Sequence, residues 1–174
     1  MDPVVEYLSD AHMTAHEDRA LRELLCACYT RPIHVAFHTR RYLSVPCPHH
    51  WIIRGPDQIF LGHVGVFERY MVAGGRRVLI GGIGTVCVAP AARGRGYVRR
   101  MLAVIHEWLP VRGAHYSVLY GRPQIYGSSG YTQVQHAFHG NDPRSDRRQA
   151  TAMIKPLRTT ACPSGDIYVY GEKF

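Results

Sequence analysis

The sequence predicts a single α+β domain over residues 1–174, a mixed and mostly antiparallel sheet flanked by helices. The order of its segments carries this prediction: an amphipathic helix, then antiparallel β-rich segments, then a strand–loop–helix–strand unit with more strands at the end. The length agrees, because 174 residues suffice for one full core and are few for two.

The first helix is predicted within TAHEDRALRELLCACY, residues 14–29. Thr14 and Glu17, three residues later, form a capping-box pattern. Apolar side chains then recur at helical spacing, at Leu21, Leu24, Leu25 and Cys28. A second, shorter helix is predicted within residues 31–43.

Three strand-like runs follow, and Gly74-Gly75 between the last two of them indicates a hairpin. Apolar residues from Val98 to Leu109 then recur at helical spacing, and Pro110 is expected to end that helix. In chain order, the predicted strands are 50–54, 59–72, 76–88, 114–121, 132–138 and 166–171, with a helical turn or loop at 122–131 and a polar surface loop at 139–152.

The chain is basic, with a net charge of +8 and a pI near 9.5. Such a balance favours nucleic acid, a membrane surface or a phosphorylated cofactor as partner, or serves solubility alone. No apolar run approaches the ~18–20 residues of a membrane span, and MDPVVEYLSD does not resemble a signal peptide. We therefore expect a cytoplasmic protein that binds no membrane.

The chain has five cysteines, an odd number, and their spacing is not that of a disulfide framework. This predicts a reducing compartment and free, mostly buried thiols. CPHH at residues 47–50 has no matching second half at zinc-like spacing, so no metal is expected. The cysteines are Cys26, Cys28, Cys47, Cys87 and Cys162.

The most informative stretch is VCVAPAARGRGYVRRML, residues 86–102. Gly94 and Gly96 directly precede a helix, so the backbone there can present a row of amides to an anion. Arg93 and Arg95 add positive charge. The spacing fits neither the P-loop nor the dinucleotide fingerprint. No aromatic-rich or helix-turn-helix pattern accompanies the arginines, so nucleic acid is not the expected partner.

This stretch resembles the acetyl-CoA-binding motif of the GNAT superfamily of N-acetyltransferases, Gln/Arg-x-x-Gly-x-Gly/Ala after a strand ending in Val-x-Pro. Arg93 and Gly96 fill the first and fourth places, whereas Val98 stands where glycine or alanine is usual. IYGSSGY, residues 125–131, is similar to the family's Phe-Tyr-x-x-x-Gly-Phe segment. With the order of elements, the resemblance covers about residues 4–138.

The resemblance implies acetyl-CoA as cosubstrate, and a strand that splays at a bulge to admit it. The backbone of residues 86–88 would pair with the pantetheine arm, and the amides of residues 94–99 would hold the diphosphate. The residues implied in binding are Val86, Cys87, Val88, Arg93, Gly94, Arg95, Gly96, Tyr97, Val98 and Arg99.

Acetyl transfer to an amine requires that the amine lose a proton, that the charge on the thioester oxygen be stabilised, and that the thiolate be protonated. By resemblance, the N–H of Val86 or Cys87 serves the oxygen and Tyr126 protonates the sulfur, since a phenol of pKa near 10 is protonated at pH 7. A nucleophilic Cys87 is the weaker alternative. The general base stays open among Asp142, Asp166, Glu172, His136, His139 and a water molecule.

Residues 49–88 and the C-terminal GDIYVYGEKF are most similar to the aminoglycoside 2'-N-acetyltransferase branch. Kasugamycin-type enzymes are the leading candidates, because LIGGIGTVCV lacks the strand glutamate of some aminoglycoside-acetylating members. The resemblance implies a small-molecule amine as substrate and antibiotic resistance as outcome. The alternatives are a peptide, protein or metabolite amine, or a CoA-responsive or nucleic-acid-binding module. A homodimer stays open, and the acids expected at the substrate are Asp142, Asp166, Glu172 and the Phe174 carboxylate.

Overall fold

The computed structural model describes residues 3–158 and 161–174. They form two compact units. The first unit is Met1–Val66 with Thr85–Val104, and the second is Phe67–Gly84 with Ile105–Phe174. Strands β3 (Phe60–Ala73) and β4 (Arg76–Val88) run from one unit into the other. The predicted α+β class is confirmed, because helices accompany a sheet with both parallel and antiparallel pairs.

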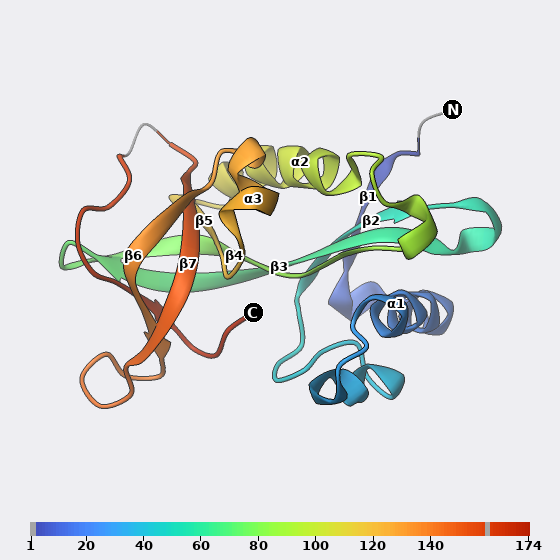
Figure 1. The fold of residues 1–174 in the computed structure, drawn as a ribbon, viewed down its shortest axis with the longest axis horizontal. Coiled ribbons are helices and arrows are strands. Elements are labelled where there is room, and N and C mark those ends of the chain that lie inside the picture. The colour runs from blue at the N-terminus through green and yellow to red at the C-terminus, as the bar shows by residue number, and fades with distance from the viewer. Residues whose placement is uncertain (1–2, 159–160) are drawn as a thin grey trace. The chain divides into compact units, whose positions relative to one another are not determined.

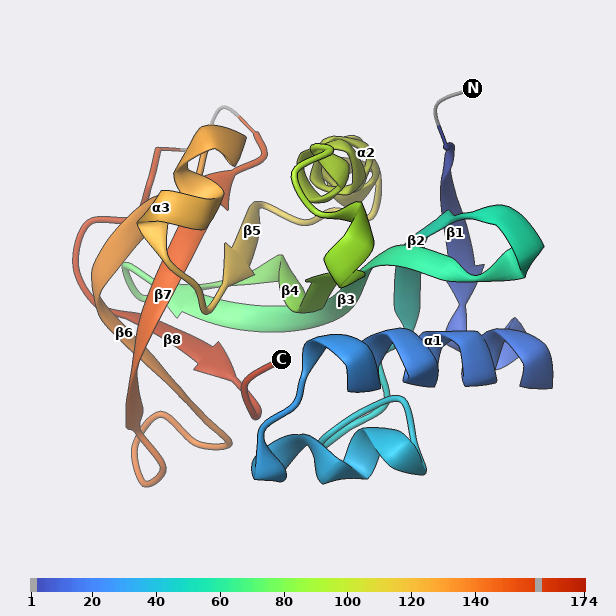
Figure 2. The same cartoon turned by 45° about the vertical axis from the view of Figure 1, so that its right-hand side comes forward.

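In the first unit, helix α1 (Ala15–Cys28) lies alongside β1 (Val5–Ser9) and β2 (His49–Arg54) (Figure 1 and Figure 2). The predicted capping box is present, with the Thr14 side chain accepting from the Glu17 amide and the Glu17 carboxylate accepting from the Thr14 amide. The apolar face of α1 packs on the strands, in a buried cluster with Leu21, Leu24, Leu25, Phe37 and Ile52.

Two predictions for the first unit need correction. Strand β1 was not predicted, and it pairs antiparallel with β2, with Tyr7 opposite Trp51. The predicted second helix is a 3-10 helix, Pro32–His38, whose single buried residue is Phe37. Shorter 3-10 turns lie at Asp10–His12, Pro56–Gln58 and Pro90–Ala92.

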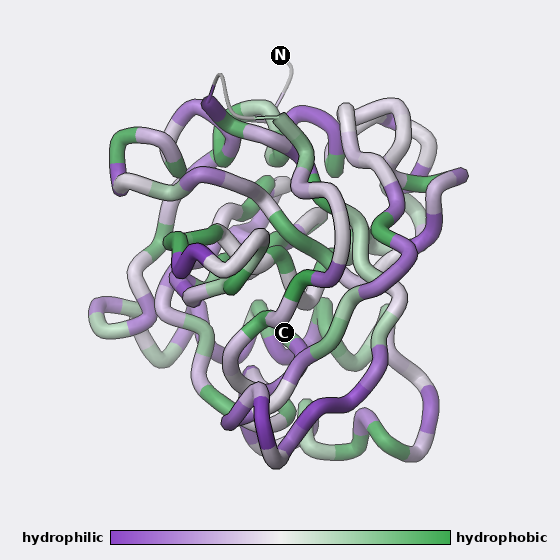
Figure 3. The backbone as a smooth tube through the Cα atoms, turned by 90° about the vertical axis from the view of Figure 1, so that its left-hand side faces the viewer, coloured by the Kyte–Doolittle hydropathy of each residue, from purple (hydrophilic) through white to green (hydrophobic). Residues whose placement is uncertain are grey.

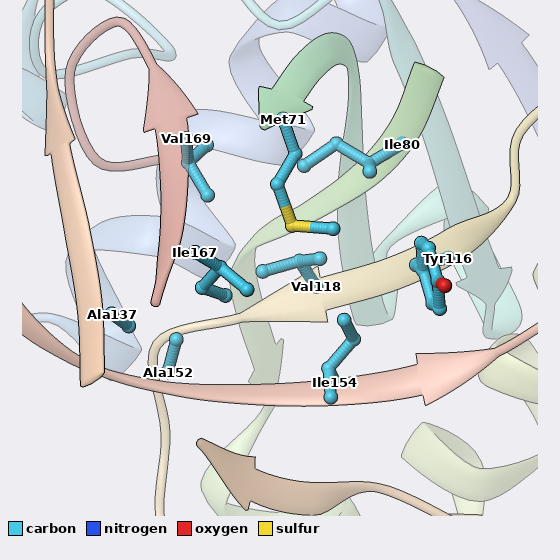
Figure 4. Packing of buried hydrophobic residues seen from close by; sticks show 9 residues of the cluster. All are labelled: Met71, Ile80, Tyr116, Val118, Ala137, Ala152, Ile154, Ile167 and Val169. Atoms are coloured by element: carbon cyan, nitrogen blue, oxygen red, sulfur yellow. The ribbon is translucent and has the colours of Figure 1, made fainter. Parts of the chain in front are cut away.

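In the second unit the strands close on themselves. Strand β5 (Tyr116–Leu119) pairs parallel with β4, and β7 (Arg148–Pro156) pairs antiparallel with both β5 and β6 (Thr132–Gly140). Strand β8 (Ile167–Tyr170) then pairs parallel with β6 and antiparallel with the end of β3. Side chains from these strands meet in the middle, among them Met71, Ile80, Val118, Ile154 and Ile167 (Figure 4).

The hairpin prediction is confirmed. Gly74 and Gly75 join β3 to β4 with φ values of 54° and 75°, which glycine adopts without strain. The predicted strands near residues 50–54, 59–72, 76–88, 114–121, 132–138 and 166–171 are all present, and the segment after β5 forms a short helical turn, α3 (Pro123–Tyr126).

Two predictions for the second unit are wrong. Helix α2 (Tyr97–Val111) contains Pro110 and ends just before Gly113, whose φ of 88° terminates it. A proline in the last turn removes one hydrogen bond without blocking the turns already formed. Residues 148–152 are not loop but the start of β7, where buried Ala150 and Ala152 alternate with exposed polar residues.

All five cysteines are free, and only Cys47 and Cys87 are buried, so the prediction that most thiols are buried is wrong.

Hydrophobic and hydrophilic stretches alternate along the described residues (Figure 3). Among the residues that the structure describes, no helix has the length and hydropathy of a membrane span.

Candidate active site

The end of β4 is held by side chains of the first unit. His63 Nδ1 lies 2.9 Å from the carbonyl oxygen of Thr85, and Tyr29 donates its hydroxyl to the carbonyl of Val86 at 2.9 Å. The carbonyl of Val88 accepts from Cys28 and Arg93, both at 3.3 Å. Three carbonyls of this short segment are thus satisfied by side chains, which fixes the direction of its peptide groups.

Thr85 has a left-handed backbone, with φ of 45°. This conformation is rare for a β-branched residue and costs about 1–3 kcal/mol, so the surrounding structure must impose it. It marks a break in the regular strand one residue before Val86. Strand β5 pairs with β4 along Ile80–Ile83, through all four of its residues, and its register ends before Thr85.

The loop after β4 has the features predicted for an anion site. Gly94 and Gly96 have φ values of 77° and 72°, so both need glycine. A Cβ on Gly94 would meet nothing within 4 Å, and one on Gly96 only the Arg99 guanidinium at 3.8 Å. The space before the loop is therefore open.

Donors of the right kind border this space. Helix α2 begins at Tyr97, and the amides of a first helical turn have no partner within the helix. Arg93, Arg95 and Arg99 are exposed, whereas the Tyr97 side chain is buried and leaves only its amide. Amides and guanidinium groups around an open glycine loop fit a diphosphate.

Cys87 does not have the environment of a nucleophile. Its side chain is buried among apolar residues of the first unit. The hydrogen bond with Cys28, together with burial, raises the pKa of the Cys87 thiol. Cys87 therefore stays protonated at pH 7, and the arrangement does not support an acyl-enzyme.

A chain of polar side chains, not predicted from the sequence, runs through the first unit to Thr85. His50 Nδ1 and His63 Nε2 are 2.9 Å apart, and His50 Nε2 lies 3.1 Å from Asp10 Oδ1. Arg41 binds the same carboxylate oxygen at 2.6 Å. Burial lowers the pKa of His63 to about 3, so this ring is neutral. The only sequence signal was the CPHH run, which was tested for a metal.

These buried histidines predict a pH-dependent stability. Burial lowers the pKa of His63 to about 3 and, with the Lys155 charge, that of His106 to about 4. Both rings are neutral in the fold but bind protons below pH ~6.5 when unfolded. Their contribution is complete above pH ~6.5 and is lost as the pH falls, by about 1.4 kcal/mol per pH unit for each ring.

Urea unfolding at several pH values between 7 and 5 measures this slope. The His106→Gln variant should be less stable at pH 7 and should show a smaller slope, because the His106 ring no longer contributes to it. A free energy of unfolding that does not change between pH 7 and pH 5 would contradict the assignment of neutral, buried rings.

Tyr126 belongs to the second unit, whereas residues 86–88 and 94–99 belong to the first. It is the last residue of α3 and half-buried. Its ring packs where Gly121 lacks a side chain, since a Cβ there would lie 2.5 Å from Tyr126 Cε2. Tyr131 stands edge-on to it at 6.2 Å, with its own hydroxyl bonded to Ser117 and His106.

The four residues expected at the substrate lie in the second unit, but the three acids already have partners. Asp142 accepts from the Arg144 amide and the Ser145 hydroxyl within its own loop. Asp166 pairs with Arg147, and Glu172 pairs with Arg148 at 2.8 Å. Each of these carboxylates therefore has a hydrogen-bond partner within the second unit.

Phe174 takes a different place. Its ring lies against Gly82, where a Cβ would collide with it, and stacks on Phe67 at 6.0 Å. Tyr120 adjoins the same ring, with centroids 5.0 Å apart. Gly82 and Gly84 of LIGGIGTVCV therefore make room for an aromatic cluster in the second unit.

Three polar atoms beside this cluster are buried without a hydrogen-bond partner among the described residues: the Tyr120 hydroxyl, His139 Nδ1, and Nε of Arg69, whose guanidinium lies 5.5 Å from the centroid of the Phe67 ring. The Tyr120 and His139 rings are 6.0 Å apart and edge-to-face, and His139 is 5 % exposed. Burial, with the Arg148 charge, lowers the pKa of His139, so the ring is neutral at pH 7. Unpaired buried polar atoms are costly, so each of them calls for an explanation. His139 was a sequence candidate, whereas no sequence signal indicated Tyr120.

Comparison with known proteins agrees with this geometry. The family model "Acetyltransferase (GNAT) domain" matches residues 12–134. A search of curated proteins gave no match. The chain is similar to the Escherichia coli GNAT N-acetyltransferase YhbS in complex with CoA, at 15% identity and a TM-score of 0.68, over 99% of this chain and 93% of that one.

Two further structures are similar. A Brucella melitensis GNAT acetyltransferase in complex with acetyl-CoA is 17% identical, with a TM-score of 0.59 over 95% of this chain and 96% of that one. A GCN5-related N-acetyltransferase from Anabaena variabilis is 20% identical, with a TM-score of 0.61, and there 75% of this chain matches 32% of a longer one.

The chain belongs to the GNAT family of acetyltransferases. It is an acetyl-CoA-dependent N-acetyltransferase with the α+β fold of that family. Among the residues described, no group of three or more histidine, cysteine, aspartate or glutamate side chains could hold a metal ion.

Proposed function

We propose that this N-acetyltransferase acetylates a small, hydroxyl-bearing amine of the aminosugar type. The 2'-amino group of a kasugamycin-type aminoglycoside is the specific candidate, and its acetylation would confer resistance. The observation that carries the proposal is the pair of neutral, buried and unpartnered polar atoms, Tyr120 OH and His139 Nδ1, beside the Phe174 cluster.

The charges of the second unit favour a substrate with few ammonium groups. A polycationic drug needs carboxylates that are free to pair with it, but Asp166 and Glu172 are each paired with an arginine. The net charge of +8 also disfavours a polycation. A phenol and a neutral imidazole suit hydroxyl groups and a single amine, while the aromatic rings suit the apolar face of a sugar.

The roles within the reaction follow from chemistry. In this proposal the general base is the neutral His139 ring, which takes the proton of the substrate ammonium group through Nδ1. The amides of residues 94–99 bind the diphosphate, and the N–H of Val86 or Cys87 stabilises the charge on the thioester oxygen. Acetyl-CoA supplies the activated acyl group, and Tyr126 delivers a proton to the departing sulfur.

A thiol-release assay with a panel of amines tests the substrate class. We expect turnover with kasugamycin and simple aminosugars, and little with polycationic aminoglycosides or lysine peptides. His139→Gln should lower kcat by about 10- to 100-fold, because positioned base catalysis typically contributes ~10²–10⁴-fold and water partly replaces it.

His136→Gln is the matched control, because His136 is an exposed residue of the same strand. Its kcat should equal that of the parent. Turnover of peptides in preference to aminosugars would contradict the proposed substrate. Equal kcat values for the two histidine variants would contradict His139 as the base.

A further inference from the structure

The contact between His63 and Thr85 has a consequence for the next residue. The carbonyl of Thr85 and the N–H of Val86 belong to one planar, trans peptide group, so they point in opposite directions. His63 Nδ1 lies 2.9 Å from that carbonyl oxygen. A donor that fixes the carbonyl on one side therefore aims the Val86 N–H to the other.

Tyr29 acts in the same way on the following peptide. Its hydroxyl donates to the Val86 carbonyl at 2.9 Å, and this carbonyl shares a peptide group with the N–H of Cys87. Two consecutive N–H groups are thus aimed by two side chains of the first unit. Both side chains come from outside β4, His63 from β3 and Tyr29 from the end of α1.

The position of the hydrogen on the His63 ring follows from its acceptor, the carbonyl of Thr85. A carbonyl carries no hydrogen, so His63 Nδ1 must be protonated to bond Thr85. Since the buried ring is neutral, its Nε2 accepts from His50 Nδ1, 2.9 Å away. The Thr85 carbonyl therefore fixes the tautomer of His63.

These contacts hold Thr85 in an unfavourable backbone conformation. Its φ of 45° is unfavourable for threonine and would relax toward an extended strand without an anchor. Relaxation would rotate the Thr85–Val86 peptide and turn the Val86 N–H away. His63 is 1% exposed and therefore cannot leave the carbonyl for water.

We propose that His63 and Tyr29 are positioning residues of the acetyltransferase, which aim the N–H of Val86 at the acetyl oxygen by holding the carbonyls of Thr85 and Val86 on its two sides. The proposal rests on the assignment of that oxygen to the end of β4 in the proposed function. It does not depend on which amine is the substrate.

The first test uses the unliganded protein. Long-range ¹⁵N–¹H NMR distinguishes the two neutral tautomers of a histidine ring. We expect His63 to be protonated at Nδ1 and not at Nε2. A ring protonated at Nε2 would overturn the proposal, because it has no hydrogen to give to Thr85.

The second test measures the carbonyl directly. The infrared band of acetyl-CoA labelled with ¹³C at the thioester carbonyl should move to lower wavenumber on binding, because the Val86 N–H polarises it. The shift should shrink in His63→Leu and in Tyr29→Phe. It should return in His63→Asn, whose amide nitrogen can replace Nδ1 as the donor to Thr85.

The loss in kcat should parallel the change in the infrared band of the thioester carbonyl. Loss of a complete oxyanion donor costs ~10²–10³-fold in kcat, so a misaimed donor should cost about 10- to 100-fold, with little change in acetyl-CoA affinity. Tyr29→Phe keeps its ring packing and covers the case in which His63→Leu does not fold. Tyr116→Phe is the control, because it also loses a hydroxyl bonded to a carbonyl, that of Ala161, and should show the parent's band and kcat.

The outcomes separate this proposal from the substrate proposal. An unchanged band and kcat in Tyr29→Phe and in folded His63→Leu would overturn it. A parent complex without any shift would overturn both the assignment of the acetyl oxygen to this strand and the positioning role. A band that responds to the variants, in a protein that acetylates no aminosugar, would support this proposal and contradict only the substrate.

Discussion

Tyr126→Phe is expected to lower kcat by ~10²–10⁴-fold, the range of positioned acid catalysis. The change keeps the ring that packs on Gly121 and beside Tyr131, so fold and acetyl-CoA affinity should stay close to those of the parent. It removes only the hydroxyl that we assign to the departing sulfur. Steady-state and single-turnover rates with the true substrate measure the effect.

The pH dependence provides a second readout of the same change. If Tyr126 must be protonated to act, the rate of the parent should fall at high pH as the phenol ionises. That fall should be absent in Tyr126→Phe. A loss confined to KM would show that the hydroxyl binds substrate and does not transfer a proton.

Tyr131→Phe is the matched control for Tyr126→Phe. The Tyr131 hydroxyl is already bonded to Ser117 at 2.6 Å and His106 at 2.9 Å, so its loss should reduce stability and leave kcat unchanged. If chemistry limits turnover and Tyr126→Phe keeps the parent's kcat, the proton must reach the sulfur from water.

Gly96→Val should weaken acetyl-CoA binding by about 10²-fold, or ~2.7 kcal/mol of binding free energy. Gly96 has φ of 72°, which valine adopts only under strain, so the loop must change its path. The amides at the start of α2 would then no longer converge on the diphosphate. Isothermal titration calorimetry with acetyl-CoA measures the loss.

Gly165→Val separates loss of the site from simple strain. Gly165 also has a positive φ, 95°, and open space around its Cβ position, but it lies in the second unit before β8. Its replacement should cost comparable stability and leave acetyl-CoA affinity unchanged. Parent-like affinity in folded Gly96→Val would exclude this loop from the cofactor site.

Local features of the fold could be predicted because their causes are local. The capping box of Thr14 and Glu17, the glycine hairpin and the apolar spacing of α1 each depend on residues within one or two turns of one another. The loop of Gly94 and Gly96 was found for the same reason, since a strand end, two glycines and a helix start are adjacent in the chain.

Features that depend on pairing across the chain were missed or misjudged. Strand β1 needs β2 as its partner, and the polar-looking β7 is a strand because β5 and β6 pair with its two edges. The helix end shows the same limit on a smaller scale: Gly113, and not Pro110, terminates α2.

The sequence by itself determined the family, the acetyl donor and the elements that carry the diphosphate loop, because motif residues stand together in the chain. Only the tertiary structure decided which polar groups are available for chemistry. Asp166 and Glu172 are each paired with an arginine, while His139, Tyr120 and His63 stand out through burial and the partners that they have or lack. Burial and partnership arise when distant segments pack, so the spacing of residues along one segment does not record them.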